Sequence, residues 1–122
     1  MITDANKNAK PWKALVVSAA LDAYQGPLLE GPLSMEIIEY RIRPQSHTGK
    51  RGLNKKGRET PYPTTAPDCL KIARAIEDSL SGVIYRDDSQ IVRETIRKTW
   101  GDKEHTFVAI QEVRNGSFPG RT

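Results

Sequence analysis

Apolar residues recur at helical spacing in two separate stretches of this chain, and these stretches constrain its fold most. From Pro11 to about Tyr24, apolar side chains at positions 12, 15, 16, 19, 20 and 23 form one stripe. From Pro67 to about Ser81, a second stripe runs through positions 69, 72, 73, 76 and 80, and Gly82 follows as a helix stop. Each stripe predicts an amphipathic helix that buries one face against another layer.

The other segments have the patterns of strands. From Leu33 to Arg43 the apolar positions change parity at Ile37 and Ile38, which predicts either a β-bulge or apolar cover on both faces. Two further strands are expected at residues 90–98 and 106–113, joined through residues 100–102 as a hairpin. This order predicts an α+β fold, a single small domain in which two main helices pack on a mixed β-sheet. We expect the domain to span residues 1–114 and residues 115–122 to form a flexible tail.

Length and composition exclude several classes of protein. The 122 residues are enough for one hydrophobic core. The single cysteine, Cys69, excludes an intramolecular disulfide framework and a cysteine-based zinc site, and it fits a reducing compartment. The longest nearly apolar run, residues 14–21, is too short to cross a bilayer, and the first ten residues lack the apolar segment of a secretory signal. We therefore expect a soluble, cytoplasmic protein with no membrane partner.

Positive charge is concentrated in one part of the chain. Residues 41–58 hold seven cations and no acidic residue, namely Arg41, Arg43, Lys50, Arg51, Lys55, Lys56 and Arg58. Such a segment suits a polyanion such as nucleic acid, but a flexible loop that needs charge only for solubility has the same pattern. Most of these cations lie in the stretch Pro44–Ala66, a long loop of the kind that is usually functional or disordered. Charge alone leaves both interpretations open.

Carboxylates stand at the ends of two predicted elements. Asp68 lies at the start of the second helix, and Asp87 and Asp88 lie between that helix and the next strand. Brought together, they would suit Mg²⁺, which prefers oxygen ligands and can activate water against a phosphate. Arg74 and Lys98 could then pair with the phosphate oxygens. The sequence therefore offers a candidate metal site.

Two conditions limit this interpretation. A helix of about 14 residues spans roughly 21 Å, so the approach requires residues 83–88 to run back along it as a strand. The acids also have ordinary structural explanations, since Thr65 to Asp68 fits a capping box and residues 87–89 fit a turn. Spacing alone does not separate a metal site from two acidic turns.

The same residues carry a resemblance to a known family. Residues 67–92 contain Pro-Asp-Cys-Leu at the helix start, Arg74 further along it, Asp-Ser-Leu, Gly82, and then Asp-Asp-Ser-Gln at residues 87–90. This stretch resembles the RusA family of Holliday junction resolvases, in particular the versions carried by phages of actinobacteria. Pro-Gln-Ser-His at residues 44–47 and Tyr-Pro-Thr-Thr at residues 62–65 also resemble the loop of such phage members. The likeness extends over residues 8–113, and the Asp-Asp-Ser-Gln segment with the preceding helix is its most specific part.

The resemblance implies a homodimeric, Mg²⁺-dependent endonuclease that nicks branched DNA, such as a four-way junction, symmetrically in recombination and repair. It implies that Asp68 and Asp88 are catalytic and metal-binding, with Asp87 as a neighbouring metal ligand, and that Arg74 takes the place of a functional lysine. DNA-binding residues would be Lys71, Arg74 and Lys98 together with the seven cations of residues 41–58. If the chain is phage-encoded, it would act in the cytoplasm of the host cell.

The chain departs from the family pattern at two places. Leu70 stands where the family has a second aspartate at the helix start, which removes one carboxylate unless Asp87 or Glu77 compensates. Only ten residues precede Pro11, so either the chain is truncated or the sheet lacks a first strand and exposes an edge. Both departures favour an alternative function, a branched-DNA-binding protein with weak or no nuclease activity. A third hypothesis is a small protein-interaction module whose basic loop is disordered.

Overall fold

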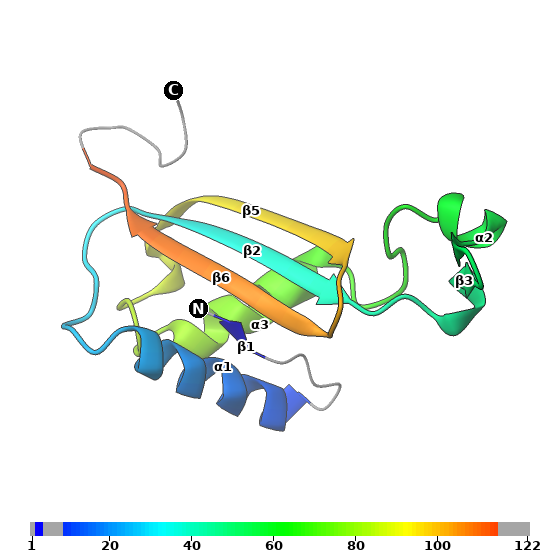
Figure 1. Ribbon diagram of the computed structural model, residues 1–122. Coiled ribbons are helices and arrows are strands. Elements are labelled where there is room, and N and C mark those ends of the chain that lie inside the picture. The colour runs from blue at the N-terminus through cyan, green and yellow to red at the C-terminus, as the bar shows by residue number, and fades with distance from the viewer. Residues whose placement is uncertain (1, 4–8, 115–122) are drawn as a thin grey trace.

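The computed structural model describes residues 2–3 and 9–114, which form a layer of two long helices against a mixed β-sheet (Figure 1). The larger elements are α1 (Ala9–Ala23), β2 (Leu33–Arg41), α3 (Cys69–Leu80), β5 (Ile91–Trp100) and β6 (His105–Glu112). Short elements are β1 (Ile2–Thr3), η1 (Gln45–His47), β3 (Thr48–Gly49), β4 (Gly52–Leu53), α2 (Lys55–Arg58) and η2 (Asp88–Gln90). The predicted α+β class is confirmed, and both predicted helices are present.

The sheet has the strand order β1-β6-β2-β5, with β2 antiparallel to β6 and parallel to β5. The predicted hairpin between the last two strands is therefore wrong, because β2 lies between them. The chain crosses the end of β2 at Gly101, whose backbone N–H donates to the carbonyl oxygen of Arg41 at 2.8 Å. A Cβ at Gly101 would lie 3.0 Å from the Tyr40 ring, so this close crossing favours glycine. The ring of Tyr40 in turn stacks on His105 at the start of β6.

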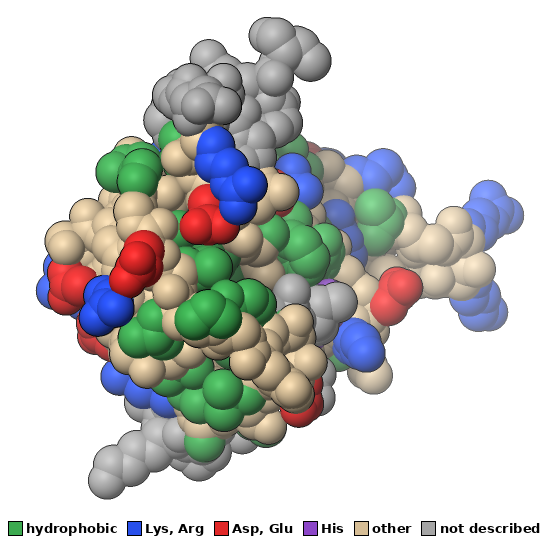
Figure 2. All heavy atoms as spheres, turned by 90° about the vertical axis from the view of Figure 1, so that its left-hand side faces the viewer, with side chains coloured by type: hydrophobic (Ala, Val, Ile, Leu, Met, Phe, Trp, Pro, Cys, Tyr) green, Lys and Arg blue, Asp and Glu red, His purple; other side chains and the backbone are tan. Residues whose placement is uncertain are grey.

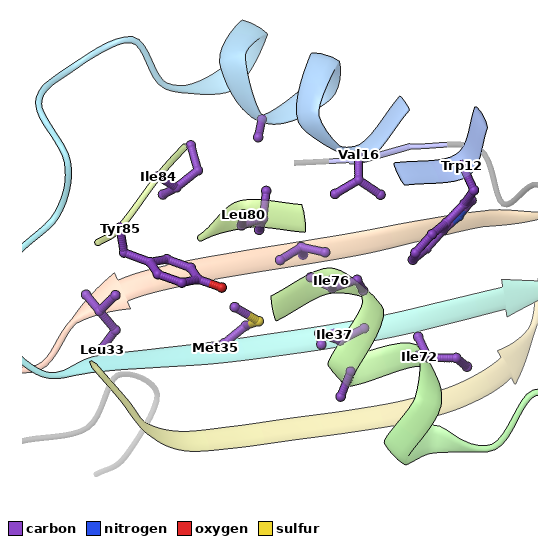
Figure 3. Packing of buried hydrophobic residues seen from close by; sticks show 13 residues of the cluster. Trp12, Val16, Leu33, Met35, Ile37, Ile72, Ile76, Leu80, Ile84 and Tyr85 are labelled. Carbon is purple, nitrogen blue, oxygen red and sulfur yellow. The ribbon is translucent and has the colours of Figure 1, made fainter. Parts of the chain in front are cut away.

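The hydrophobic core lies between the helices and one face of the sheet (Figure 3). α1 contributes Trp12, Val16 and Ala20, and α3 contributes a stripe at positions 72, 73, 76 and 80. These are the positions that helical spacing assigns to one face, so burial follows the sequence pattern. The outer members of the predicted α1 stripe do not all reach the core, since Leu15 remains 41% exposed.

β2 is the central strand, and it carries neighbouring buried apolar residues on its two faces, Ile37 and Ile38. Ile37 is fully buried under the helices, and Ile38 on the opposite face is only 7% exposed. The register of β2 against β6 is continuous from Leu33 to Tyr40, and the irregularity against β5 lies at Leu33/Ser34. The change of parity in the sequence therefore records burial on both sides of a central strand, not a bulge at Ile37.

The long basic segment is folded. Residues 45–58 contain η1, a short hairpin of β3 and β4, and α2, and they project from the end of the sheet (Figure 1). We call residues 44–60 the basic arm. A short N-terminal strand is also present, since Ile2 and Thr3 pair with β6. The predicted tail, residues 115–122, lies outside the described residues. Within the described part of the chain, no helix is both long and apolar enough to span a membrane.

Candidate active site and nucleic-acid interface

α3 separates the acids that the sequence singled out. Asp68 is its N-cap residue, and Asp87 and Asp88 follow its C-terminal end by several residues. The twelve residues of α3 span about 18 Å at about 1.5 Å per residue. Residues 83–88 do not run back along the helix, because Val83 and Ile84 turn tightly onto the carbonyl oxygen of Leu80. Within one chain, Asp68 and Asp88 therefore lie at opposite ends of α3.

The neighbours of the two aspartates lead to the same conclusion. The backbone next to Asp68 is held by Lys98, near the end of β5, whereas Asp88 lies just before the start of that strand. From Ile91 to Lys98 the strand extends about 23 Å at about 3.3 Å per residue. Among the residues that the structure describes, no group of three or more His, Cys, Asp or Glu residues could hold a metal ion. A single described chain therefore does not fit a Mg²⁺ ion shared by Asp68 and Asp88.

Asp68 is exposed and free of local capping. Its backbone has the extended geometry of an N-cap, but its side chain makes no capping hydrogen bond. The capping box predicted at Thr65 is wrong, because α3 begins at Cys69 and its N-cap is Asp68. The nearest described cation is Lys71, whose Nζ lies 3.8 Å from Asp68 Oδ1 in a highly exposed pair. Such a pair contributes little to stability, so the carboxylate of Asp68 is available to a ligand.

Asp87 has a structural role that the sequence also allowed. Its side chain accepts the backbone N–H of Ser89 at 3.0 Å, and Gln90 Oε1 accepts the N–H of Asp87 at 3.0 Å. These bonds form a capping box at η2, and hydrogen bonds from the side chain and the backbone of Ser89 lower the pKa of Asp87 below its ordinary range. The Gln90 amide also donates to the carbonyl oxygens of Leu29 and Gly31. The Asp-Asp-Ser-Gln motif therefore fixes the turn that presents Asp88.

Asp88 lies near Glu94, which the sequence reasoning did not assign to a site, and near Glu77, which it named only as a possible replacement carboxylate. Glu94 on β5 faces α3, and its interaction with Glu77 and Asp88, added to burial, raises its pKa to about 7. Burial is the largest cause, followed by a side-chain hydrogen bond with Glu77. Glu94 Oε2 is buried and has no hydrogen-bond partner in the described part of the chain. Glu94 lies on the helix-facing side of β5, together with Ile96 and Lys98. The alternation of the strand could therefore have shown from the sequence that Glu94 faces α3.

Two predicted DNA-binding residues instead hold the segment that leads into Asp68. Lys98 Nζ donates to the carbonyl oxygens of Thr65 at 2.9 Å and Pro67 at 3.2 Å. Arg41 donates to the carbonyl oxygen of Ala66 at 2.9 Å. These charge-assisted bonds position the backbone immediately before α3. In the structure, Arg41 and Lys98 therefore help to position Asp68.

Arg43 has a comparable role at the base of the basic arm. Its guanidinium donates to the carbonyl oxygens of Gly57 and Thr60 and lies 5.0 Å from the ring centroid of Trp100. His47 packs edge-on against the same indole and is buried. Burial and the nearby charges of Arg43 and Lys56 lower the pKa of His47. The arm is thus anchored to the end of β5 by a compact aromatic and cationic cluster.

The remaining predicted cations are exposed. This group comprises Lys50, Arg51, Lys55, Lys56 and Arg58 on the arm, and Lys71 and Arg74 on α3. On the face of the molecule shown in Figure 2, by contrast, Lys and Arg lie among Asp and Glu. The concentration of five cations against one acid, Glu59, on a projecting arm favours contact with a polyanion. The structure thus combines a basic arm with an exposed Asp68 at one end of α3 and a half-buried Asp88 beyond the other.

A small α+β domain with this combination of charges has features typical of proteins that bind and process nucleic acid. Comparison with known families is specific, because the model of the family described as "Endodeoxyribonuclease RusA" matches residues 2–111. The chain belongs to this family. A curated relative, the "Uncharacterized protein YqaN" of Bacillus subtilis (strain 168), is 31% identical over 106 residues, which cover 86% of this chain and 75% of the relative. Membership supports a Holliday junction resolving endonuclease, of a family that acts on branched DNA and generally depends on a divalent metal.

Proposed function

We propose that two copies of this chain form a Mg²⁺-dependent endodeoxyribonuclease that resolves four-way DNA junctions by paired nicking in recombination and repair. The observation that carries the proposal is the placement of Asp68 and Asp88 at opposite ends of α3. A twofold axis that sets two α3 helices antiparallel brings Asp68 of one subunit to the end where Asp88 of the partner subunit lies. Each dimer then has two equivalent composite sites, as paired nicking requires.

The sheet offers an edge for this arrangement. In the described residues β5 pairs with β2 on one side only, so it is an edge strand of the sheet. Antiparallel pairing of two β5 strands about a twofold axis joins the sheets and leaves α3 of both subunits on the same face. The start of one β5, next to Asp88, then lies beside the end of the other, next to Lys98 and Asp68. Edge pairing therefore gives the same composite site.

The residues have distinct roles in this proposal. Asp68 and Asp88 hold Mg²⁺, and Asp87 holds the turn that presents Asp88. When bound, the ion supplies an activated water and stabilises negative charge on the phosphate. Arg74, exposed on α3, binds a phosphate oxygen near the site, and Lys71 contributes to the same surface.

The basic arm binds the phosphate backbone away from the site. Arg43 holds the base of the arm, and Arg41 and Lys98 hold the segment that precedes Asp68. The family membership and the excess of positive charge on the arm support branched DNA as the substrate.

A second function has its own support. Leu70 is 67% exposed at the position of the family's second aspartate, so each site has one carboxylate fewer to bind the ion. A protein with this deficit would bind four-way junctions without cleaving them at a useful rate.

A junction assay with and without Mg²⁺ separates the two functions. We expect wild-type protein to nick opposed strands only with Mg²⁺, and Asp88→Asn to bind the junction without nicking it. If wild-type protein binds the junction but leaves it uncut in the presence of Mg²⁺, the second function, junction binding without cleavage, is the correct one. Nicking that survives Asp88→Asn would contradict the assignment of the site. Leu70→Asp adds a carboxylate at the helix start, and we expect it to lower the Mg²⁺ concentration needed for half-maximal nicking.

A further inference from the structure

Tyr62 is the only exposed aromatic residue in the part of the chain that the structure describes, and its side chain is 64% exposed. It lies in residues 61–67, which run from the basic arm back to the start of α3 (Figure 1). Its ring and hydroxyl make no hydrogen bond or ring contact with another described residue. Packing within the fold therefore does not account for an aromatic side chain at this position.

The backbone on both sides of Tyr62 is held by the end of β5. The indole of Trp100 donates to the carbonyl oxygen of Thr60 at 2.9 Å, and Lys98 Nζ donates to the carbonyl oxygen of Thr65 at 2.9 Å. These two donors are two residues apart and lie on one face of the strand, so about 7 Å of β5 separates them. The segment that carries Tyr62 is thus a closed loop with both ends fixed to the sheet.

Two prolines restrict the loop further. Pro61 and Pro63 flank Tyr62, and each fixes its own backbone φ angle. Pro63 is buried, although the residues on both sides of it are exposed. Little backbone freedom remains to be lost when a ligand contacts the Tyr62 ring, which lowers the entropic cost of binding there.

The position of Tyr62 links the two parts of the proposed DNA surface. Arg58 precedes it on the basic arm, and Asp68 follows it by six residues. Lys71, one turn into α3, adds a cation beyond Asp68. A DNA strand that runs from Asp68 onto the basic arm therefore passes the Tyr62 ring. An exposed tyrosine can also contact a protein, but cations on both sides of this one favour a polyanion.

We infer that Tyr62 stacks on a nucleobase at the crossover of a four-way junction, and that this contact makes binding depend on the branch. The inference rests on the proposed function. In continuous duplex both faces of a base pair are covered by neighbouring pairs, whereas a pair at an opened crossover has one uncovered face. Aromatic side chains stack on such bases, and they do so with little sequence preference because every base has a π-face. Tyr62 would thus recognise the structure of the DNA and not its sequence.

Binding to a four-way junction and to a continuous duplex of the same sequence tests this inference. Divalent metal is omitted so that the junction stays intact. We expect Tyr62→Ala to weaken junction binding about tenfold, as loss of one base–aromatic stack does, and to leave duplex binding unchanged. Tyr62→Phe keeps the ring and should bind the junction within about twofold of wild type. Unchanged junction affinity of Tyr62→Ala, or an equal loss on both DNAs, would overturn the inference.

A matched control lies on α1. Leu21 is 48% exposed, so Leu21→Ala also truncates an exposed apolar side chain and should bind both DNAs as wild type does. An equal loss of junction binding in this variant would contradict a specific role of Tyr62. If wild-type protein does not prefer the junction to the duplex, the proposed function fails. If wild-type protein prefers the junction and Tyr62→Ala keeps that preference, only the present inference fails.

A second measurement locates the base and does not depend on the affinity of one variant alone. Each nucleotide that flanks the crossover is replaced in turn by an abasic nucleotide. We expect wild-type affinity to fall about tenfold at one position and at its symmetry equivalent. Tyr62→Ala has already lost the stack, so the same replacement should cost it less than about twofold. Equal losses for the two proteins at every position would contradict stacking by Tyr62.

Discussion

The indole Nε1 of Trp100 donates a hydrogen bond of 2.9 Å to the carbonyl oxygen of Thr60, so the last residue of β5 holds the base of the basic arm. The guanidinium of Arg43 lies over the same indole, and the His47 ring makes a T-shaped contact with it. The cations at the tip of the arm are therefore presented by a folded unit with a fixed base, which lowers the entropic cost of ordering them on DNA.

Trp100→Phe removes this hydrogen bond while keeping an aromatic ring. A hydrogen bond of this kind contributes about 0.5–1.5 kcal/mol, so local opening of the arm should become about 2- to 12-fold more frequent. Limited trypsin digestion at the Lys and Arg residues of the arm measures this opening. Tyr62→Phe, an aromatic change at an exposed position, serves as the control. Equal cleavage of the two variants would contradict the anchoring role of Trp100.

Lys55→Ala tests the arm as a phosphate-binding surface. If Lys55 neutralises one phosphate, the slope of log affinity against log salt should become less negative by about 0.9 for duplex arms of the junction. Lys13→Ala removes the same charge from α1 and should leave the slope unchanged. Binding titrations at four or five salt concentrations give both slopes. A shift in the slope of the Lys13 variant equal to that of the Lys55 variant would show that only net charge matters.

Substitutions of Asp87 distinguish capping from metal binding. Asp87→Ala removes the acceptor for the Ser89 N–H, and we expect it to lower the free energy of unfolding by about 1 kcal/mol. Asp87→Asn keeps an acceptor oxygen but not the charge, so it should retain stability and most of the nicking rate. Urea unfolding and junction cleavage measure the two effects. Loss of Mg²⁺-dependent nicking in a stable Asp87→Asn variant would make Asp87 a metal ligand.

The raised pKa of Glu94 predicts that the stability of the fold depends on pH. Its pKa is about 7 in the folded state against an ordinary value of 4.5, so between these values the folded chain binds more protons than the unfolded chain. Stability from this group is therefore lost as pH rises from about 4.5 through 7. Glu94→Gln removes the dependence, and because solvent screens a partly exposed carboxyl we expect it to raise Tm at pH 8 by only about 2–4 °C. Thermal unfolding from pH 5 to 8 without divalent metal tests this, with the exposed Glu104→Gln as control; identical curves for the two variants would contradict it.

The helices could be predicted from the sequence because their signals are local. The stripe from Trp12 to Ala20 and the stripe from Ile72 to Leu80 depend only on spacing along one element, and both faces are buried as expected. Strand pairing is not local. Residues 91–100 and 105–112 follow each other closely and resemble a hairpin, but β2 separates them, and nothing within either segment encodes the partner on its other side.

The candidate site was predictable as a set of residues but not as a geometry. Asp68 and Asp88 were found from motif likeness, yet their separation depends on the tight turn after Leu80, where Gly82 has φ +79°. Arg43 and Lys98 resemble phosphate contacts in the sequence, because a pattern of charge does not show which backbone carbonyls a side chain will reach. The Glu77–Glu94 contact joins a helix and a strand, and only the fold brings these residues together.

Mixing two inactive variants tests the composite site most directly. Asp68→Asn and Asp88→Asn proteins are each unfolded, combined and refolded so that subunits exchange, and nicking of a four-way junction is measured with Mg²⁺. If each site uses Asp68 of one subunit and Asp88 of the other, a mixed dimer has one intact site, and single-strand nicking should return without paired resolution. If the mixture stays as inactive as its two components although mixed dimers have formed, the two aspartates do not share a site across subunits.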